Sequence, residues 1–140
     1  MALAIAKAGG RVVQEESIAY VKNNGPLDVG EACWTNAGGT LKCKYIIHTV
    51  GPMYKEKYHY SQEKMLGKAV LSALKIATDL GAKSIAMPAI SSGIFGFPKP
   101  LVAEILFAEV TEFSKKNSSS SLEEAHFTNF DSETANIFAE

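Results

Sequence analysis

The sequence has few of the features that mark several large classes of protein. It contains 2 cysteines in 140 residues, too few for the disulfide framework of a small secreted domain. No segment reaches the roughly 20 consecutive apolar residues that a membrane-spanning helix needs. The amino terminus also lacks the basic start of a secretory signal. We therefore expect a reduced, intracellular protein of the nucleus or cytoplasm, without membrane contact.

An excess of charge of one sign is also absent. Lys and Arg total 14 and Asp and Glu total 15, so the formal net charge is -1. This balance argues against a broad nucleic-acid-binding face, although it is compatible with a local cationic pocket. A hydrophobic content of 46% is typical of a folded chain. Because the length suits one core rather than two, we expect residues 1–140 to form a single domain.

Helical and strand patterns alternate along the chain. Helices are predicted over residues 2–8, 11–24, 61–80, 98–116 and 131–138. Strands are predicted over residues 31–35, 44–50, 83–87 and 125–130. Ser61 is the expected N-cap of the helix over 61–80, and Trp34 is expected in the core. The alternation indicates an α/β fold with a mostly parallel sheet, in which ligands bind beyond the carboxyl ends of the strands.

Two of the predicted helices have an apolar stripe. In the helix over 61–80 it comprises Leu66, Val70, Ala73, Leu74, Ala77 and Leu80, and in the helix over 98–116 it comprises Leu101, Ile105, Ala108 and Phe113. The chain opens within a helix, and its short strands are few for the number of helices. One sheet edge is therefore expected to be bare. Either the chain is a fragment, or another chain covers that edge, for example in a homodimer.

The strongest candidate for chemistry is the loop Ser91-Ser92-Gly93-Ile94-Phe95-Gly96-Phe97-Pro98, between a predicted strand and a predicted helix. Its glycines allow backbone N–H groups to approach a ligand closely. The following helix offers free N–H groups and the positive end of its dipole. These features suit a phosphate or pyrophosphate, although the spacing is neither the dinucleotide fingerprint nor a Walker loop. The alternative is a tight strand-to-helix turn whose phenylalanines pack in the core.

Other strand ends supply weaker candidates. The Phe130 ring is placed to stack on a base and the Asp131 carboxylate to accept a hydrogen bond, but a core ring followed by an N-cap is the alternative. Ser91, His48 and Asp131 are not expected to form a hydrolytic triad, because no nucleophile elbow surrounds Ser91. His48 is expected to be a hydrogen-bonded structural residue. The cysteines and histidines lack metal-ligand spacing, so we expect neither a metal nor a cofactor.

Four segments together resemble the macro domain family, an α/β module that binds ADP-ribose. They are residues 2–10 (ALAIAKAGG), 24–27 with 30–31 (NGPL, GE), 45–52 (YIIHTVGP) and 88–98 (PAISSGIFGFP), in the family's order. The resemblance implies a three-layer α/β/α fold with a mixed, mostly parallel sheet. It also implies an N-terminally truncated domain. The family's first strands, its adenine-reading aspartate, its Asn-Ala-Ala-Asn strand end and a glycine-rich loop would all precede Met1.

The resemblance further implies binding of ADP-ribose or a related nucleotide diphosphate, free or on ADP-ribosylated proteins. Residues 91–95 would wrap the diphosphate, with Ile94 and Phe95 over the distal ribose, while Phe130 would face adenine. The ligand-binding residues expected in this way are Val50, Gly51, Pro52, Pro88, Ser91, Ser92, Gly93, Ile94, Phe95, Gly96, Phe130 and Asp131. One alternative is a mono-ADP-ribosyl hydrolase that uses Phe95 and Gly93. The other is a ligand-free structural or dimerisation domain.

Overall fold

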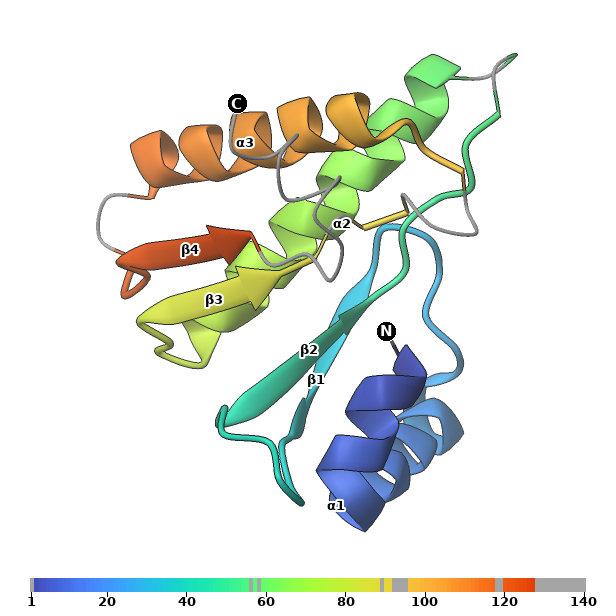
Figure 1. Ribbon diagram of the computed structural model, residues 1–140, viewed down its shortest axis with the longest axis vertical. Coiled ribbons are helices and arrows are strands. Elements are labelled where there is room, and N and C mark those ends of the chain that lie inside the picture. The colour runs from blue at the N-terminus through green and yellow to red at the C-terminus, as the bar shows by residue number, and fades with distance from the viewer. Residues whose placement is uncertain are drawn as a thin grey trace.

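The computed structural model describes residues 2–55, 57, 59–88, 90–91, 96–117 and 120–127, and of residues 2–7 and 59 only the backbone. The elements follow the order α1 (Ala2–Asn24), β1 (Ala32–Asn36), β2 (Tyr45–Thr49), α2 (His59–Asp79), β3 (Ser84–Met87), α3 (Lys99–Lys116) and β4 (Glu124–Phe127) (Figure 1). Each predicted strand and each of the first four predicted helices has a counterpart. The predicted helix over 131–138 lies outside the described residues.

Gly10 divides α1 into two helical segments. Its φ of 65° and ψ of -151° are non-helical, and a positive φ favours glycine, which has no Cβ to clash with the backbone. The interruption confirms the prediction of separate helices over 2–8 and 11–24. Close to this interruption, α1 contacts the loop that follows β1. There the Thr40 N–H donates a hydrogen bond to the Ala8 carbonyl at 2.8 Å.

The four strands form two separate pairs. β1 and β2 are antiparallel, from Ala32 opposite Thr49 to Asn36 opposite Tyr45. β3 and β4 are parallel, from Ser84 opposite Glu124 to Met87 opposite Phe127. The expected α/β fold with mixed strand directions is thus confirmed. The first pair is antiparallel because residues 37–44 are too few for the crossover that a parallel pair requires.

α2 and α3 supply most of the core. Its buried residues are Leu66, Val70, Leu74, Met87, Phe97, Val102, Ala103, Leu106 and Phe113. The predicted stripe of α2 is therefore confirmed, except that Leu80 is only half-buried. In α3 the predicted stripe is confirmed at Phe113, while Leu101 and Ile105 are only partly buried against the core. The prediction is wrong at Ala108, which is exposed, and the fully buried residues are Val102 and Leu106. Because apolar residues are adjacent in the sequence of α3, the helix has two possible apolar faces. Packing against α2 determines which of them is buried.

Two further predictions are wrong. Ser61 is not an N-cap, because α2 begins at His59 and encloses it. Trp34 is not a core residue, because 43% of its surface is exposed. The side chains of β1 alternate between two faces, and Cys33 and Thr35 take the buried positions. The Trp34 ring instead packs edge-on against Tyr45, with the ring centroids 5.3 Å apart.

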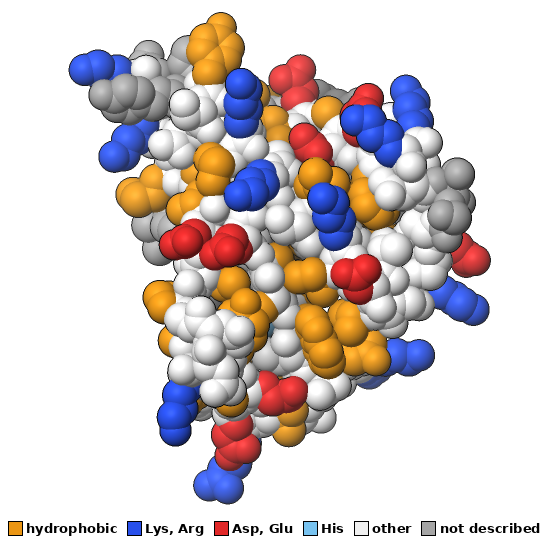
Figure 2. All heavy atoms as spheres, turned by 180° about the vertical axis from the view of Figure 1, so that it is seen from behind, with side chains coloured by type: hydrophobic (Ala, Val, Ile, Leu, Met, Phe, Trp, Pro, Cys, Tyr) orange, Lys and Arg blue, Asp and Glu red, His pale blue; other side chains and the backbone are white. Residues whose placement is uncertain are grey.

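The outer surface shows no concentration of one charge on the face drawn in Figure 2. Basic and acidic side chains are interspersed there, with apolar side chains between them. Among the described helices, none is both long enough and apolar enough to cross a bilayer.

Candidate ligand-binding site

The carboxyl ends of β2 and β3 lie against each other. Gly51 and Pro52, which follow β2, are buried. A Cβ built on Gly51 would collide with the Oγ of Ser91 and would lie 2.7 Å from the Cγ2 of Ile90. Glycine is therefore required at position 51 by a close approach between the two chain segments. The sequence placed candidate residues at both strand ends, and the structure brings these ends together.

Ser91 is held in an unusual conformation at the start of the candidate loop. Its φ is 67°, in the left-handed region that disfavours a side chain by about 1–3 kcal/mol. Its Oγ is buried and has no hydrogen-bond partner among the described residues, which destabilises the fold by a further amount of about 1–3 kcal/mol. Strain and an unpaired buried hydroxyl at one residue are typical of a functional site.

The far end of the same loop is anchored in the core. The Phe97 N–H donates to the Ser91 carbonyl at 2.9 Å and closes the loop. The Phe97 side chain is 2% exposed and packs edge-on against Tyr54, with the ring centroids 5.1 Å apart. Phe97 is thus a core residue. Its partner Tyr54 lies in a polar and aromatic stretch, where no pattern indicated a core contact.

The helix that follows the loop begins as predicted. Pro98 is the N-cap of α3, and a proline lies in the first two helical positions. Proline suits this place because its missing N–H would have no partner within the helix. The loop between Ser91 and Phe97 therefore leads directly onto the amino end of a helix, which favours anions.

The remaining predicted residues stay predictions. Pro88 is half-buried and accepts a hydrogen bond from the Ile90 N–H at 2.9 Å, and Gly96 is exposed. Val50 is half-buried and accepts from the Gly30 N–H at 2.8 Å. Six candidates lie outside the described residues, namely Ser92, Gly93, Ile94, Phe95, Phe130 and Asp131.

His48 and Cys33 are neutral structural residues. They are paired across β1 and β2, and the His48 Nε2 lies 3.0 Å from the Thr35 Oγ1. Burial lowers the pKa of His48 and raises the pKa of the Cys33 thiol. The expected hydrogen-bonded histidine is confirmed. Among the described residues there is no cluster of His, Cys, Asp and Glu side chains able to hold a metal.

The lowered pKa of His48 predicts a loss of stability in mild acid. Below about pH 6.5 the unfolded chain takes up a proton that the folded chain resists, so the free energy of unfolding falls as the pH drops. Urea unfolding at about pH 7.5 and about pH 5.5 measures this fall. The fall in the free energy of unfolding should be smaller in His48→Asn than in the wild type. It should be unchanged in His126→Asn, since His126 is exposed. An equal fall in the wild type and His48→Asn would contradict the prediction.

The sequence also matches a known family. The Macro domain family matches residues 1–106. The chain belongs to this family. A Thermotoga maritima protein is 47% identical to this macro domain over 98% of the chain, which is 22% of that protein. A Sulfolobus acidocaldarius protein is 43% identical over 83% of the chain and 61% of its own length. The chain thus spans less than two thirds of either relative.

Solved macrodomains share the fold. The macrodomain of Oceanobacillus iheyensis has been solved with ADP and, as a point mutant, with ADPR. The structure with ADPR has a TM-score of 0.86 and 27% identity, covering 97% of this chain and 72% of the other. This similarity confirms the macro-domain α/β fold that the four sequence segments predicted.

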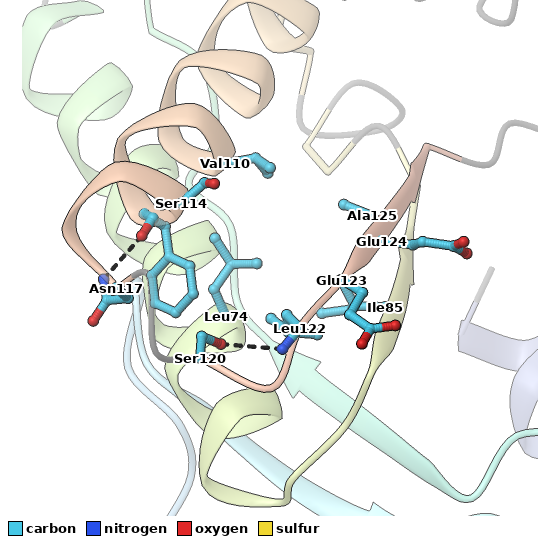
Figure 3. Close-up of a pocket in the computed structure, with 11 residues that line it drawn as sticks. Leu74, Ile85, Val110, Ser114, Asn117, Ser120, Leu122, Glu123, Glu124 and Ala125 are labelled. Atoms are coloured by element: carbon cyan, nitrogen blue, oxygen red, sulfur yellow. Dashed lines mark hydrogen bonds between the residues drawn. The ribbon is translucent and has the colours of Figure 1, made fainter.

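The macro domain also has a shallow hollow away from the candidate site. The hollow has a volume of about 150 Å³ and lies between the carboxyl end of α3 and the amino ends of β3 and β4 (Figure 3). Leu74, Ile85 and Phe113 form part of its apolar lining. On its rim, the Ser120 Oγ lies 2.8 Å from the Thr78 Oγ1 and accepts from the Leu122 N–H at 3.2 Å. The Ser120 and Thr78 hydroxyls are thus already paired, whereas the Ser91 hydroxyl has no partner among the described residues.

Proposed function

We propose that this macro domain binds ADP-ribose or a related nucleotide diphosphate, free or attached to a protein, between residues 50–52 and the loop over 88–96. The observation that carries the proposal is Ser91. Its hydroxyl is buried and unpaired among the described residues, and its backbone is strained. A diphosphate oxygen would accept a hydrogen bond from this hydroxyl, for which the described residues supply no partner.

Two further observations support a diphosphate as the ligand. The loop that Ser91 opens leads onto the amino end of α3, where free N–H groups and the helix dipole favour anions. The Oceanobacillus iheyensis macrodomain, which shares the fold, has been solved with ADP and, as a point mutant, with ADPR. The hydrolase alternative depends on Phe95 and Gly93, which lie outside the described residues, so the proposal is one of binding.

The Ser91→Ala variant tests whether the Ser91 hydroxyl contacts the ligand or only stabilises the fold. Removing an unpaired buried hydroxyl should leave the free energy of unfolding unchanged or raise it. Loss of one hydrogen bond to the ligand should weaken ADP-ribose binding by about fivefold to tenfold. Isothermal titration calorimetry measures the affinity, and thermal unfolding measures the stability.

The matched control is Ser114→Ala, an exposed serine in α3 that lines the distant hollow. It should change neither affinity nor stability. Equal affinities of the wild type and Ser91→Ala would contradict the role given to Ser91. Absence of heat from the wild type up to millimolar ADP-ribose would contradict the proposed function itself.

A further inference from the structure

Charges of both signs are mixed over the surface in Figure 2, but the exposed side of α2 carries mainly basic charge. The exposed residues described in this helix are Tyr60, Ser61, Lys64, Lys68, Lys75 and Asp79. Lys64, Lys68 and Lys75 are four and seven residues apart, so they share one face of the helix. Asp79 lies at the carboxyl end of α2, and Glu63 is half-buried and about 100° around the helix from Lys64. We call Lys64, Lys68 and Lys75 the lysine face.

The three ammonium groups of the lysine face have no ion-pair partner among the described residues. The stem of Lys68 packs against Gly30, since a Cβ built there would lie 3.0 Å from the Lys68 Cδ. The carboxylate of the neighbouring Glu31 is engaged elsewhere, because it accepts a hydrogen bond from the Asp28 N–H at 2.7 Å. The charges of the lysine face are therefore available to a partner, and their sign favours an anionic one.

The lysine face begins next to the candidate ligand-binding site. Gly51 lies against Ser91 at one end of the candidate loop. Tyr54 packs against Phe97 at the other end. Lys55 follows directly and is exposed, and Figure 1 shows this segment leading from the end of β2 to the amino end of α2. A segment that leaves the site along α2 would therefore meet the lysines one after another.

We propose that the lysine face binds an acidic polypeptide segment that carries the ADP-ribosyl group held in the site. This inference rests on the proposed function and names the partner, a protein modified within a stretch rich in Asp and Glu. Lys64 and Lys68 lie about 6 Å apart along the helix axis, close to the roughly 6.6 Å between alternate side chains of an extended chain. Two carboxylates on one side of such a segment can therefore meet Lys64 and Lys68, and a third can meet Lys75.

A nucleic acid fits the lysine face less well. Three lysines on one helix are few beside the roughly 6–10 phosphate contacts of strongly salt-dependent DNA-binding proteins. The formal net charge of -1 adds no general attraction for a polyanion. A short acidic segment needs only a few cations, and its attachment to a ligand bound at the neighbouring site raises its effective concentration. Individually weak surface ion pairs then contribute to binding.

Two synthetic peptides test the proposal with the full chain. Each carries ADP-ribose on one central serine, and the flanking positions are Glu in the first peptide and Gln in the second. At low salt the Glu peptide should bind about threefold to tenfold more tightly, because exposed ion pairs are individually weak. The preference should shrink as the salt concentration is raised. Free ADP-ribose is titrated in parallel, and absence of its binding would contradict the proposed function itself.

The double variant Lys64→Gln/Lys68→Gln should lose the preference for the Glu peptide, while its affinity for free ADP-ribose stays within about twofold of the wild type. Gln is a good helix former, so α2 should be retained. The matched control is Lys42→Gln/Lys44→Gln, which removes two exposed lysines just before β2, at the end of that strand opposite to the site. It changes the net charge equally and should keep the preference.

Three results would overturn the proposal. The first is equal affinity of the wild type for the Glu and Gln peptides. The second is a preference that survives in Lys64→Gln/Lys68→Gln or disappears equally in the control variant. The third is binding of a single-stranded oligonucleotide that depends on Lys64 and Lys68 without any preference for the Glu peptide, which would assign the lysine face to nucleic acid.

Discussion

Phe97→Ala should lower the free energy of unfolding by about 3–5 kcal/mol, a large part of the roughly 5–15 kcal/mol of a typical domain. Phe97 is 2% exposed, contacts the Tyr54 ring and belongs to the core that unites α2, α3 and β3. Its removal leaves a cavity at the point where the candidate loop joins α3. Thermal unfolding should show a Tm lower by roughly 10–17 °C.

Phe107→Ala is the matched control for this loss. Phe107 is 41% exposed and packs edge-on against Phe127, with the ring centroids 4.6 Å apart. Since less of its surface is buried, the change should lower the free energy of unfolding by about 1–2 kcal/mol. If Phe97→Ala destabilised the chain no more than Phe107→Ala, Phe97 would not anchor the loop.

Gly51→Ala should weaken ADP-ribose binding by about 10-fold to 100-fold. The new Cβ would collide with the Ser91 Oγ and would lie 2.7 Å from the Ile90 Cγ2. Relieving such overlap takes about 1–3 kcal/mol, and the nearest atoms that can move belong to the candidate site. The Ser91 segment would have to shift away from residues 50–52, which separates the two walls of the site. Calorimetry with ADP-ribose measures the loss.

Gly67→Ala is the corresponding control. The three atoms nearest to its Cβ would all belong to the Glu109 side chain, with Oε1 at 2.6 Å, and the end of this side chain can swing aside. The affinity for ADP-ribose should therefore stay within about twofold of the wild type. Equal affinities of Gly51→Ala and Gly67→Ala would show that the contact between Gly51 and Ser91 has no part in binding.

Local patterns were enough to predict most of the elements. Apolar spacing located α2 and its buried residues Leu66, Val70 and Leu74. Gly9-Gly10 predicted the interruption in α1, because glycine loses more backbone conformational entropy in a helix than other residues do. The helix start at Pro98 followed from the fixed φ of proline. In each case neighbouring residues determine the outcome.

Predictions that depend on distant contacts were less successful. Whether Leu101 or Val102 faces inward depends on α2, and whether Trp34 or Cys33 is buried depends on which face of β1 is covered. The left-handed conformation of Ser91 could not be predicted, since a serine rarely adopts it without support from the surrounding fold. The hydrogen-bonded pairing of His48 with Thr35 also required the register of β1 against β2.

The central claim is that the nucleotide lies where β2 and β3 end. The most direct measurement is a titration of the full chain with ADP-ribose, followed by the chemical shifts of the backbone amides. We predict the largest changes at Gly51, Ser91 and Gly96, with little change around the hollow near Asn117 and Leu122. Changes concentrated at Asn117 and Leu122, or none at Gly51 and Ser91 at saturating ligand, would contradict the claim.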